Sequence, residues 1–279
     1  MAPAALPYFD QLLARFAAGD PDLERCFGRH VHWGYWPDPA VDPERARAGF
    51  AAAAEALSQR LLQRAAIRAG ERVLDVGCGF GGTVASLNAG WQGLELTGLN
   101  LDPRQIARAR RLVQPRGDNR ISWLVGDACA LPCPDASQDV VLAVECIFHF
   151  PSRQRFLDQV ARVLRPGGRL LLSDFVPITP LARAWRLLRP AAARAVCNPT
   201  YGPVDCSWDR HHYRRQAALR GLQRVDDDDI TAHTLPTYPV VRQVFTAMGA
   251  PQAVADTARI ERLSRWGLLR YRILTFRKP

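Results

Sequence analysis

The spacing of apolar and polar positions changes along the chain, and the change marks the first structural boundary. Between residues 43 and 65 apolar side chains recur every three or four positions, which predicts an amphipathic helix. Asp42 followed by Pro43 is a typical helix start, and Gly70 lies just beyond the helix end. We therefore expect residues 1–69 to form a helical segment that packs against the rest of the chain.

From residue 72 onward, short apolar runs alternate with helical stretches. Helix starts are predicted at Thr83, at Asp102-Pro103 and at Ser152. Because strand, helix and strand in repetition are typical of a parallel sheet covered by helices on both faces, we expect an α/β fold. The expected strands are 72–76, 94–99, 121–125, 139–144, 169–175, 222–232 and 268–276.

Residues 178–221 interrupt this alternation with closely spaced prolines and scattered aromatic residues, which predicts an irregular insertion. Insertions at the edge of a sheet often shape a binding pocket. Further helices are expected between residues 238 and 265. The predicted organisation is a helical lid over 1–69 and a core over 70–279 that carries the insertion as a substrate cap.

Composition places the chain among ordinary globular proteins. Its 279 residues, 48% of them hydrophobic, can bury a sizeable core but leave little room for two independent modules. There is no run of 18 apolar residues and no signal-peptide core in the first thirty positions, so a cytoplasmic protein is expected. Seven cysteines, an odd number, favour free thiols over a disulfide framework.

The chain is basic, with a formal charge of +10, and Lys278 is the only lysine among its 37 basic residues. Such arginine usage is typical of a GC-rich genome, although a positive field also favours an anionic partner. Arg183, Arg186 and Arg189 lie on one predicted helix. They either bind an anionic acceptor or form a solvated face.

A glycine-rich segment, VLDVGCGFGG at 73–82, carries the clearest chemical signal. An apolar strand ends at Asp75 and Val76 and passes through a run of glycines into a helix. Glycine lets the backbone approach a ligand closely, and the helix start presents free amides to it. The lysine of a phosphate-binding loop is missing from this segment. By itself the segment fits either a ligand-binding loop or a tight turn capped by Asp75.

Together with five further segments, this loop resembles the class I S-adenosylmethionine (SAM)-dependent methyltransferases. The sequence is most similar to the small-molecule branch that includes tocopherol, ubiquinone and rebeccamycin-type sugar O-methyltransferases. The resemblance implies a Rossmann-like, doubly wound sheet of seven strands in the order 3-2-1-4-5-7-6, with the seventh strand antiparallel. The matching segments are HVHWGYW (30–36), GLNLDPRQ (98–105), GDACALPCPDASQDVVLAVE (126–145), HF (149–150) and LRPGGRLLLSDF (164–175).

The same resemblance implies a SAM site by matching motif positions. Asp75 would face the methionine half, and Tyr35 would close over it. Asn100, where the family usually has an acid, would meet the ribose hydroxyls with help from Gln105. Asp127, which otherwise fits a turn, would accept a hydrogen bond from the adenine amine. The full expected set is Tyr35, Asp75, Gly77, Cys78, Gly79, Asn100, Gln105, Asp127, Ala128 and Glu145, with S-adenosylhomocysteine as the product.

Methyl transfer from a sulfonium is an in-line displacement, so the protein chiefly holds the acceptor at attack distance. A hydroxyl acceptor must also lose a proton. His149 and Asp174 match positions where rebeccamycin-type enzymes carry a histidine and an aspartate, which implies a general base and its orienting partner. The alternative for His149 is a packing role. Glu145 is a rival base, above all for a carbon acceptor whose cation aromatic rings stabilise.

We expect O-methylation of a hydroxyl on a small bacterial secondary metabolite, without a metal ion. A carbon or nitrogen acceptor is the alternative. A nucleic-acid methyltransferase fits the charge, but the fourth strand ends in AVEC and not in the NPPY-type loop of base-amine methylases. A binding protein on a degenerate scaffold would not need the intact Asp75 and His149. Acceptor contacts are expected from Trp36, Tyr201, Trp208 and His212.

Overall fold

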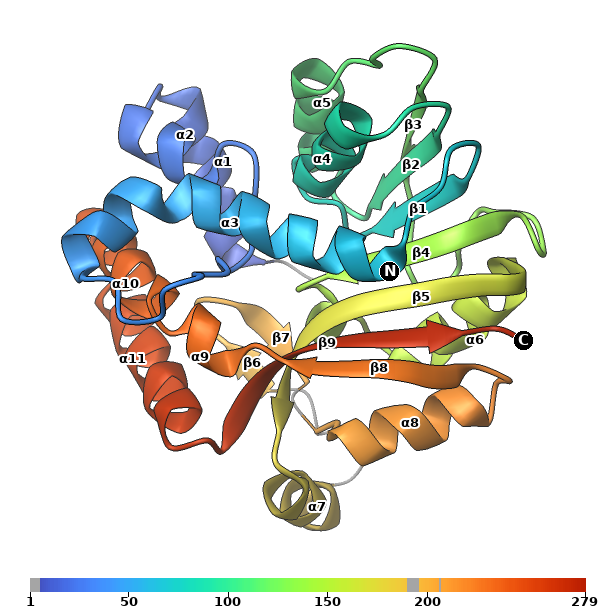
Figure 1. Ribbon diagram of the computed structural model, residues 1–279. Helices are drawn as coiled ribbons and strands as arrows, with labels where there is room; N and C mark the ends of the chain where they lie inside the picture. Colours follow the sequence, from blue (N-terminus) through green and yellow to red (C-terminus); the bar gives the residue numbers. More distant parts are fainter. Residues whose placement is uncertain (1–5, 190–195, 206) are drawn as a thin grey trace.

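The computed structural model describes residues 6–189, 196–205 and 207–279. A seven-stranded sheet forms the centre of the molecule, with strands in the order β3-β2-β1-β4-β5-β9-β8 (Figure 1). Strands β1 to β5 are parallel, whereas β9 is antiparallel to both of its neighbours. Counted without the separate β6–β7 hairpin, this confirms the predicted order 3-2-1-4-5-7-6. The strands are β1 (Arg72–Val76), β2 (Glu95–Asn100), β3 (Arg120–Val125), β4 (Gln138–Val144), β5 (Leu164–Pro177), β6 (Val196–Asn198), β7 (Gly202–Val204), β8 (Gln223–Asp229) and β9 (Leu269–Arg277).

Helices cover both faces of the sheet, which is why β4 is buried along its whole length. On one face α6 and α8 pack on the strands, with Phe156 and Tyr213 fully buried. On the other face α3 and α4 do so, with Leu61 and Leu87 fully buried. The helices are α1 (Pro7–Ala17), α2 (Pro21–Phe27), α3 (Pro43–Ala65), α4 (Gly82–Gly90), α5 (Pro103–Leu112), α6 (Arg153–Val163), α7 (Thr179–Leu188), α8 (Arg210–Ala218), α9 (Thr231–Thr234), α10 (Thr237–Ala247) and α11 (Pro251–Arg265), with one 3-10 turn, η1 (Ile147–His149).

Side-chain caps explain three of the predicted helix starts, whereas α4 begins at Gly82, one residue before the expected Thr83, without a side-chain cap. Asp42 accepts hydrogen bonds from two backbone amides at the start of α3, and Asp102 accepts one at the start of α5. Ser152 caps α6 in the same way. Strand β5 is longer than expected, because the chain continues through Gly167, at φ +80°, as part of the strand.

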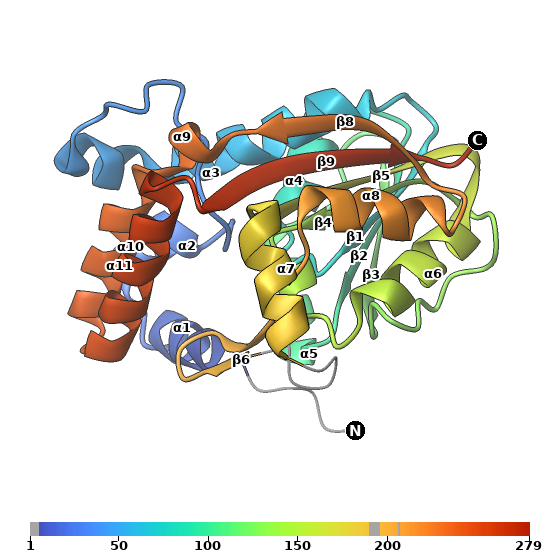
Figure 2. The ribbon, with the colours of Figure 1, turned by 90° about the horizontal axis from the view of Figure 1, so that it is seen from below.

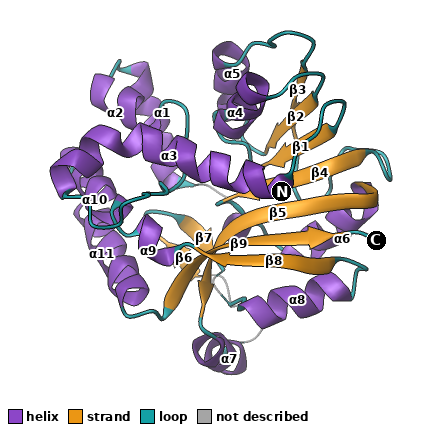
Figure 3. Ribbon diagram, viewed as in Figure 1, coloured by secondary structure: helices purple, strands orange, loops and turns teal. Residues whose placement is uncertain are grey.

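A third apolar cluster lies at the carboxyl end of the parallel strands and joins the two ends of the chain. Helices α1, α2 and α3 meet α10 and α11 there, and Phe9, Phe27 and Phe245 are buried in the contact. Figure 2 shows α10 and α11 side by side with α1 next to them, and Figure 3 shows the same pair of helices from the other view. These helices therefore cover the edge of the sheet at which a doubly wound fold binds its ligands.

Residues 178–221 contain α7, the β6–β7 hairpin and α8, except for 190–195 and 206, which lie outside the described residues. Helix α8 packs on the sheet, since Tyr213 and Ala217 are fully buried there. The part of this segment that faces the ligand-binding edge is the β6–β7 hairpin. Within the described part of the chain, no helix is both long and apolar enough to span a membrane.

Candidate active site

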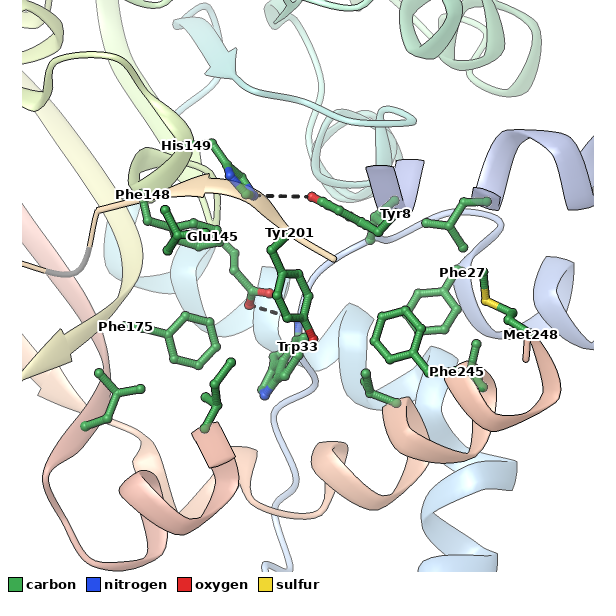
Figure 4. A pocket seen from close by; sticks show the side chains of 17 residues that line it. Tyr8, Phe27, Trp33, Glu145, Phe148, His149, Phe175, Tyr201, Phe245 and Met248 are labelled. Atoms are coloured by element: carbon green, nitrogen blue, oxygen red, sulfur yellow. Dashed lines mark hydrogen bonds between the residues drawn. The ribbon is translucent and has the colours of Figure 1, made fainter. Parts of the chain in front are cut away.

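Two cavities meet at the carboxyl ends of β1 and β4. The first, the loop cavity, follows the glycine-rich loop and the ends of β2 and β3. The second, the apolar cavity, lies beneath α1, α10 and α11 and is lined mainly by apolar and aromatic side chains. Tyr8, Val31, Glu145 and His149 line both cavities, so the junction between them is made by these four residues. Figure 4 shows the apolar cavity with Tyr8, Glu145 and His149 in its wall.

The glycine-rich loop leaves its backbone open to the loop cavity. Gly77 and Gly79 adopt φ +74° and +54°, a region that favours glycine. A Cβ on Gly77 would lie 2.7 Å from Cβ of Cys146, so no side chain fits at this position. Cys78, between the two glycines, is buried and also lines the cavity. Glycine is therefore favoured at 77 and 79 by the positive φ, and at 77 also because Cys146 lies too close for a side chain.

Asp75 lies at the base of this loop and is only 2% exposed. Its Oδ2 atom has no hydrogen-bond partner among the described residues, and burial raises the pKa of the carboxyl to about 8. A buried carboxylate oxygen without a partner is costly unless a ligand supplies one. A cationic ligand with ammonium and sulfonium groups, such as SAM, fits this position.

Asn100 and Gln105 lie together on the wall of the loop cavity. The Asn100 side chain donates to Gln105 Oε1 over 3.2 Å, and its own oxygen accepts from the amide of Asp102. Gln105 is only 2% exposed. The Asn100 oxygen thus orders the start of α5, and a role of this pair in ribose binding stays a prediction.

Asp127 and Ala128 follow β3 and line the same cavity. Oδ1 of Asp127 accepts from the Cys129 amide over 2.8 Å, which is the turn role that its sequence context also allowed. The Asp127 side chain is otherwise exposed, and Ala128 is buried beside it. Their expected contact with adenine stays a prediction.

Tyr35 lies away from both cavities, which corrects the expectation that it closes over the cofactor. Its ring stacks on His233 at 4.7 Å and lies under the guanidinium of Arg60 at 4.6 Å. The segment at 30–36 instead presents His30, His32 and Val31 to the loop cavity and Trp33 to the apolar cavity. The segment at 30–36 therefore lines both cavities, but with side chains other than that of Tyr35.

Glu145 directly follows β4 with φ +51°, an uncommon conformation for a residue other than glycine. Its Oε2 atom accepts from the backbone amide of Trp33 over 2.9 Å and from the hydroxyl of Tyr271. Burial raises the pKa of Glu145 to about 8. This carboxyl therefore ties the segment at 30–36 to the sheet, and near pH 7 it is mainly protonated, with Oε2 already bonded to two donors.

His149 ends the 3-10 turn that follows Glu145. Its Nδ1 atom lies 3.1 Å from the carbonyl oxygen of Pro203, which can only accept, so Nδ1 carries the hydrogen. Burial lowers the pKa of His149 to about 4, and the charge of Arg153 adds to the effect. The ring is therefore neutral near pH 7, with an unprotonated Nε2 atom that faces the Tyr8 hydroxyl at 3.5 Å.

Asp174 does not orient His149, and this expectation is corrected. The Asp174 carboxylate lies 2.9 Å from Nη1 of Arg153 and accepts from the Tyr213 hydroxyl over 2.6 Å, with its side chain fully buried. It forms a buried ion pair between β5, α6 and α8. The backbone of Pro203, on the β6–β7 hairpin, orients the histidine instead.

Of the four expected acceptor contacts, Tyr201 alone lines the apolar cavity, and its hydroxyl is bonded to Thr257 at 2.9 Å. Trp36 is buried in the third cluster, where its indole donates to Thr237. Trp208 packs in the core against Tyr213, and His212 contacts the edge of Trp208. The expectations for Trp36, Trp208 and His212 are therefore corrected.

Most of the residues that line the apolar cavity were not predicted from the sequence. Tyr8 and Leu12 come from α1, and Val241, Phe245 and Met248 come from α10 and the turn after it. The apolar spacing of α10 predicts a buried face, but it does not reveal which ligand or element that face meets. Only the packing of the two chain ends against each other shows it.

Comparison with known proteins agrees with this geometry. A family model described as a methyltransferase domain matches residues 74–172. Methyltransferase GfsG of Streptomyces halstedii is 34% identical over 231 residues, which are 81% of this chain and 77% of that protein. The 27-O-demethylrifamycin SV methyltransferase of Amycolatopsis mediterranei is 34% identical over 269 residues, covering 92% of this chain and 93% of that protein.

Solved structures share the fold at lower identity. A geranyl diphosphate C-methyltransferase from Streptomyces coelicolor, crystallised with Mg²⁺, geranyl diphosphate and S-adenosylhomocysteine, aligns with a TM-score of 0.69 and 20% identity over the whole of both chains. The [4+2]-cyclase SpnF aligns with a TM-score of 0.71 and 23% identity, over 98% of this chain and 94% of that one.

Proposed function

The chain belongs to the class I SAM-dependent methyltransferases that act on small molecules, and from this premise we propose that it methylates a hydroxyl group of a bacterial secondary metabolite. The observation that carries the proposal is the state of His149. Its Nε2 lone pair lies at the junction of the two cavities, because Nδ1 is held by the carbonyl of Pro203. A hydroxyl acceptor needs such a base, and a neutral imidazole can take its proton.

SAM bound in the loop cavity supplies a methyl group on a positively charged sulfur. Asp75 offers a buried carboxylate to that cation, and the open backbone at Gly77 and Gly79 leaves room for it. The acceptor hydroxyl donates its proton to Nε2 of His149 as its oxygen forms the new bond to carbon and the carbon–sulfur bond breaks. The apolar walls exclude water, which limits competing hydrolysis.

The lining of the apolar cavity favours a neutral acceptor. Among its described lining residues there is no lysine or arginine, and the one carboxyl is Glu145. Burial of an anion without a countercharge is costly. Arg186, one of the three arginines considered for an anionic acceptor, instead pairs with Asp209 at 3.0 Å. We therefore propose a neutral acceptor with a mainly apolar surface, and not an anionic acceptor.

The named relatives support this assignment. The rifamycin relative is an O-methyltransferase of a bacterial metabolite by its name, and it spans nearly the whole chain. A carbon acceptor is the second candidate, because Trp33, Phe148 and Phe175 surround the cavity near Glu145 and their ring faces can stabilise a cation.

The test is methyl transfer from labelled SAM to 27-O-demethylrifamycin SV and to a panel of neutral polyketide alcohols and phenols, with bulk RNA as a parallel arm. We expect label on an oxygen of a small molecule and about a 100-fold or greater loss of kcat in His149→Ala. Label on carbon in the product would favour the second candidate, and label in RNA would overturn the substrate class. Full turnover by His149→Ala would exclude His149 as the base.

A further inference from the structure

Tyr8 lies at the junction of the two cavities and has contacts on both sides. Its backbone amide donates to the carbonyl of Thr200 over 3.2 Å, which ties α1 to the β6–β7 hairpin. Its ring packs against Phe9 at 4.3 Å and against the edge of Tyr201 at 5.9 Å. The ring also lies nearly parallel to that of His149, with an angle of 25° between the planes. Helix α1 thus delivers a phenol to the proposed base.

The Tyr8 hydroxyl can act only as a donor toward His149. Nε2 of His149 is the acceptor atom of that ring, because Nδ1 donates to Pro203. Burial and then the charge of Glu145 raise the pKa of Tyr8 well above its usual value, so the phenol keeps its proton. At 3.5 Å the contact is at the outer limit of a hydrogen bond. The two groups therefore point at each other without making a strong bond.

We propose that Tyr8 is the positioning residue for the acceptor hydroxyl: its phenol donates to the acceptor oxygen while that oxygen donates its own hydrogen to Nε2 of His149. This inference rests on the proposed function. An oxygen bonded to both groups at about 2.8 Å, with a tetrahedral angle, needs them roughly 4.5 Å apart. Acceptor entry must therefore move Tyr8 about 1 Å away from His149.

Two hydrogen bonds to one hydroxyl fix its rotation as well as its place. The proton points to His149, the phenol occupies one lone pair, and a remaining lone pair is free for the methyl group. Both partners are uncharged near neutral pH, which matches a neutral acceptor. On this assignment α1 is part of the acceptor site, and Tyr8 distinguishes a hydroxyl from an apolar group of the same size.

The experiment measures binding of two probes to the protein loaded with S-adenosylhomocysteine. The probes are 4-propylphenol and propylbenzene, which differ by one hydroxyl group, and titration calorimetry gives each Kd. The test variant is Tyr8→Phe, which keeps the ring contacts. The matched control is Tyr238→Phe, which removes another buried phenol that is bonded to Ser264 at 2.8 Å and lines neither cavity.

We expect Tyr8→Phe to raise the Kd of 4-propylphenol about 5- to 10-fold and that of propylbenzene less than about twofold. Tyr238→Phe should change neither value by more than about twofold. Equal effects of Tyr8→Phe on both probes would overturn the proposal, and so would a wild-type protein that binds both probes equally well.

Failure of the proposed function gives a different result. It would appear as absence of methyl transfer to any hydroxyl by the wild-type protein, whatever the probes show. If the wild type methylates hydroxyl acceptors and Tyr8→Phe leaves kcat, KM and probe binding unchanged, Tyr8 alone is excluded. If Tyr8→Phe mainly raises KM and His149→Ala causes the larger loss in kcat, the two residues have the separate roles proposed here.

Discussion

The carbonyl oxygen of Pro203 accepts the Nδ1 hydrogen of His149 over 3.1 Å, and this bond determines which nitrogen of the ring faces the cavities. A carboxylate in the same place would stabilise the imidazolium and raise the pKa of the ring. A carbonyl orients the ring with a much weaker effect on its charge. The histidine therefore stays neutral near pH 7, and the lone pair of its Nε2 atom faces the junction of the two cavities.

The pH dependence of methyl transfer should reflect the lowered pKa of His149, which is about 4. With SAM at a saturating concentration, we expect kcat/KM for the acceptor to be limited by this base only below about pH 5, and to fall about tenfold per unit below pH 4. Stability should also fall as the pH drops from 6.5 towards 4. The reason is that the histidine binds a proton more tightly in the unfolded chain than in the folded protein. A rate profile with circular dichroism at each pH is the measurement. An acidic limb near pH 6.5 would contradict the neutral, buried state of the ring.

Binding of SAM should release a proton from Asp75. The pKa of the carboxyl is about 8 without a ligand, and a bound cation lowers it, so the affinity for SAM should rise as pH approaches 8. Calorimetry at pH 6.5 in two buffers of different ionisation enthalpy counts the released protons. Asp75→Asn is the control, because any proton lost by the amine of SAM itself remains in that variant. Equal proton release by both proteins would rule out the linkage.

Asp174 should be needed for stability and not for proton transfer. Asp174→Ala leaves the Arg153 guanidinium buried without its carboxylate, and we expect a loss of about 3–5 kcal/mol in the free energy of unfolding. Urea denaturation measures it. Replacement of both partners, Arg153→Met with Asp174→Leu, should cost less because no charge is left behind. A stable Asp174→Ala protein with lost turnover would restore the catalytic role that the sequence suggested.

A side chain at Gly77 should be destabilising because it would clash with Cys146, and Gly117 serves to separate this clash from backbone strain. In Gly77→Ala the new Cβ would meet Cβ of Cys146 at 2.7 Å, at a φ of +74°. Gly117→Ala also has a positive φ, +58°, but its Cβ meets nothing within 4 Å. We expect Gly117→Ala to cost about 1 kcal/mol and Gly77→Ala about 2–4 kcal/mol, by urea denaturation. Equal losses would show that strain alone sets the requirement.

Local signals explain why most of the fold could be predicted. Apolar runs of strand length, and caps such as Asp42 and Asp102, act within a few residues, so the sequence contains the whole cause. The order of the strands is different, because it depends on contacts between distant segments. The strand order was predicted from the resemblance to a known family, and the position of β9 between β5 and β8 confirms that prediction.

The site residues that could not be predicted depend on contacts across the fold. Asp174 was expected to orient His149, but it is bonded to Arg153 and Tyr213. No pattern in the sequence shows that these two residues lie next to it. In the segment at 30–36 the motif does not say which rings point inward, and Trp33 does so while Tyr35 packs on His233. Tyr8 carries no signal at all until α1 is seen against the β6–β7 hairpin.

The two cavities share α1 and the turn after β4, but the rest of their lining comes largely from different parts of the chain. The glycine-rich loop and the ends of β2 and β3 line only the loop cavity, whereas α10 and α11 line only the apolar cavity. Changes in these outer helices can alter the molecule that is accepted while the methyl-donor site stays intact. Such a division gives evolution, and protein engineers, a way to obtain new acceptor preferences by exchanging α10 and α11 around a constant centre.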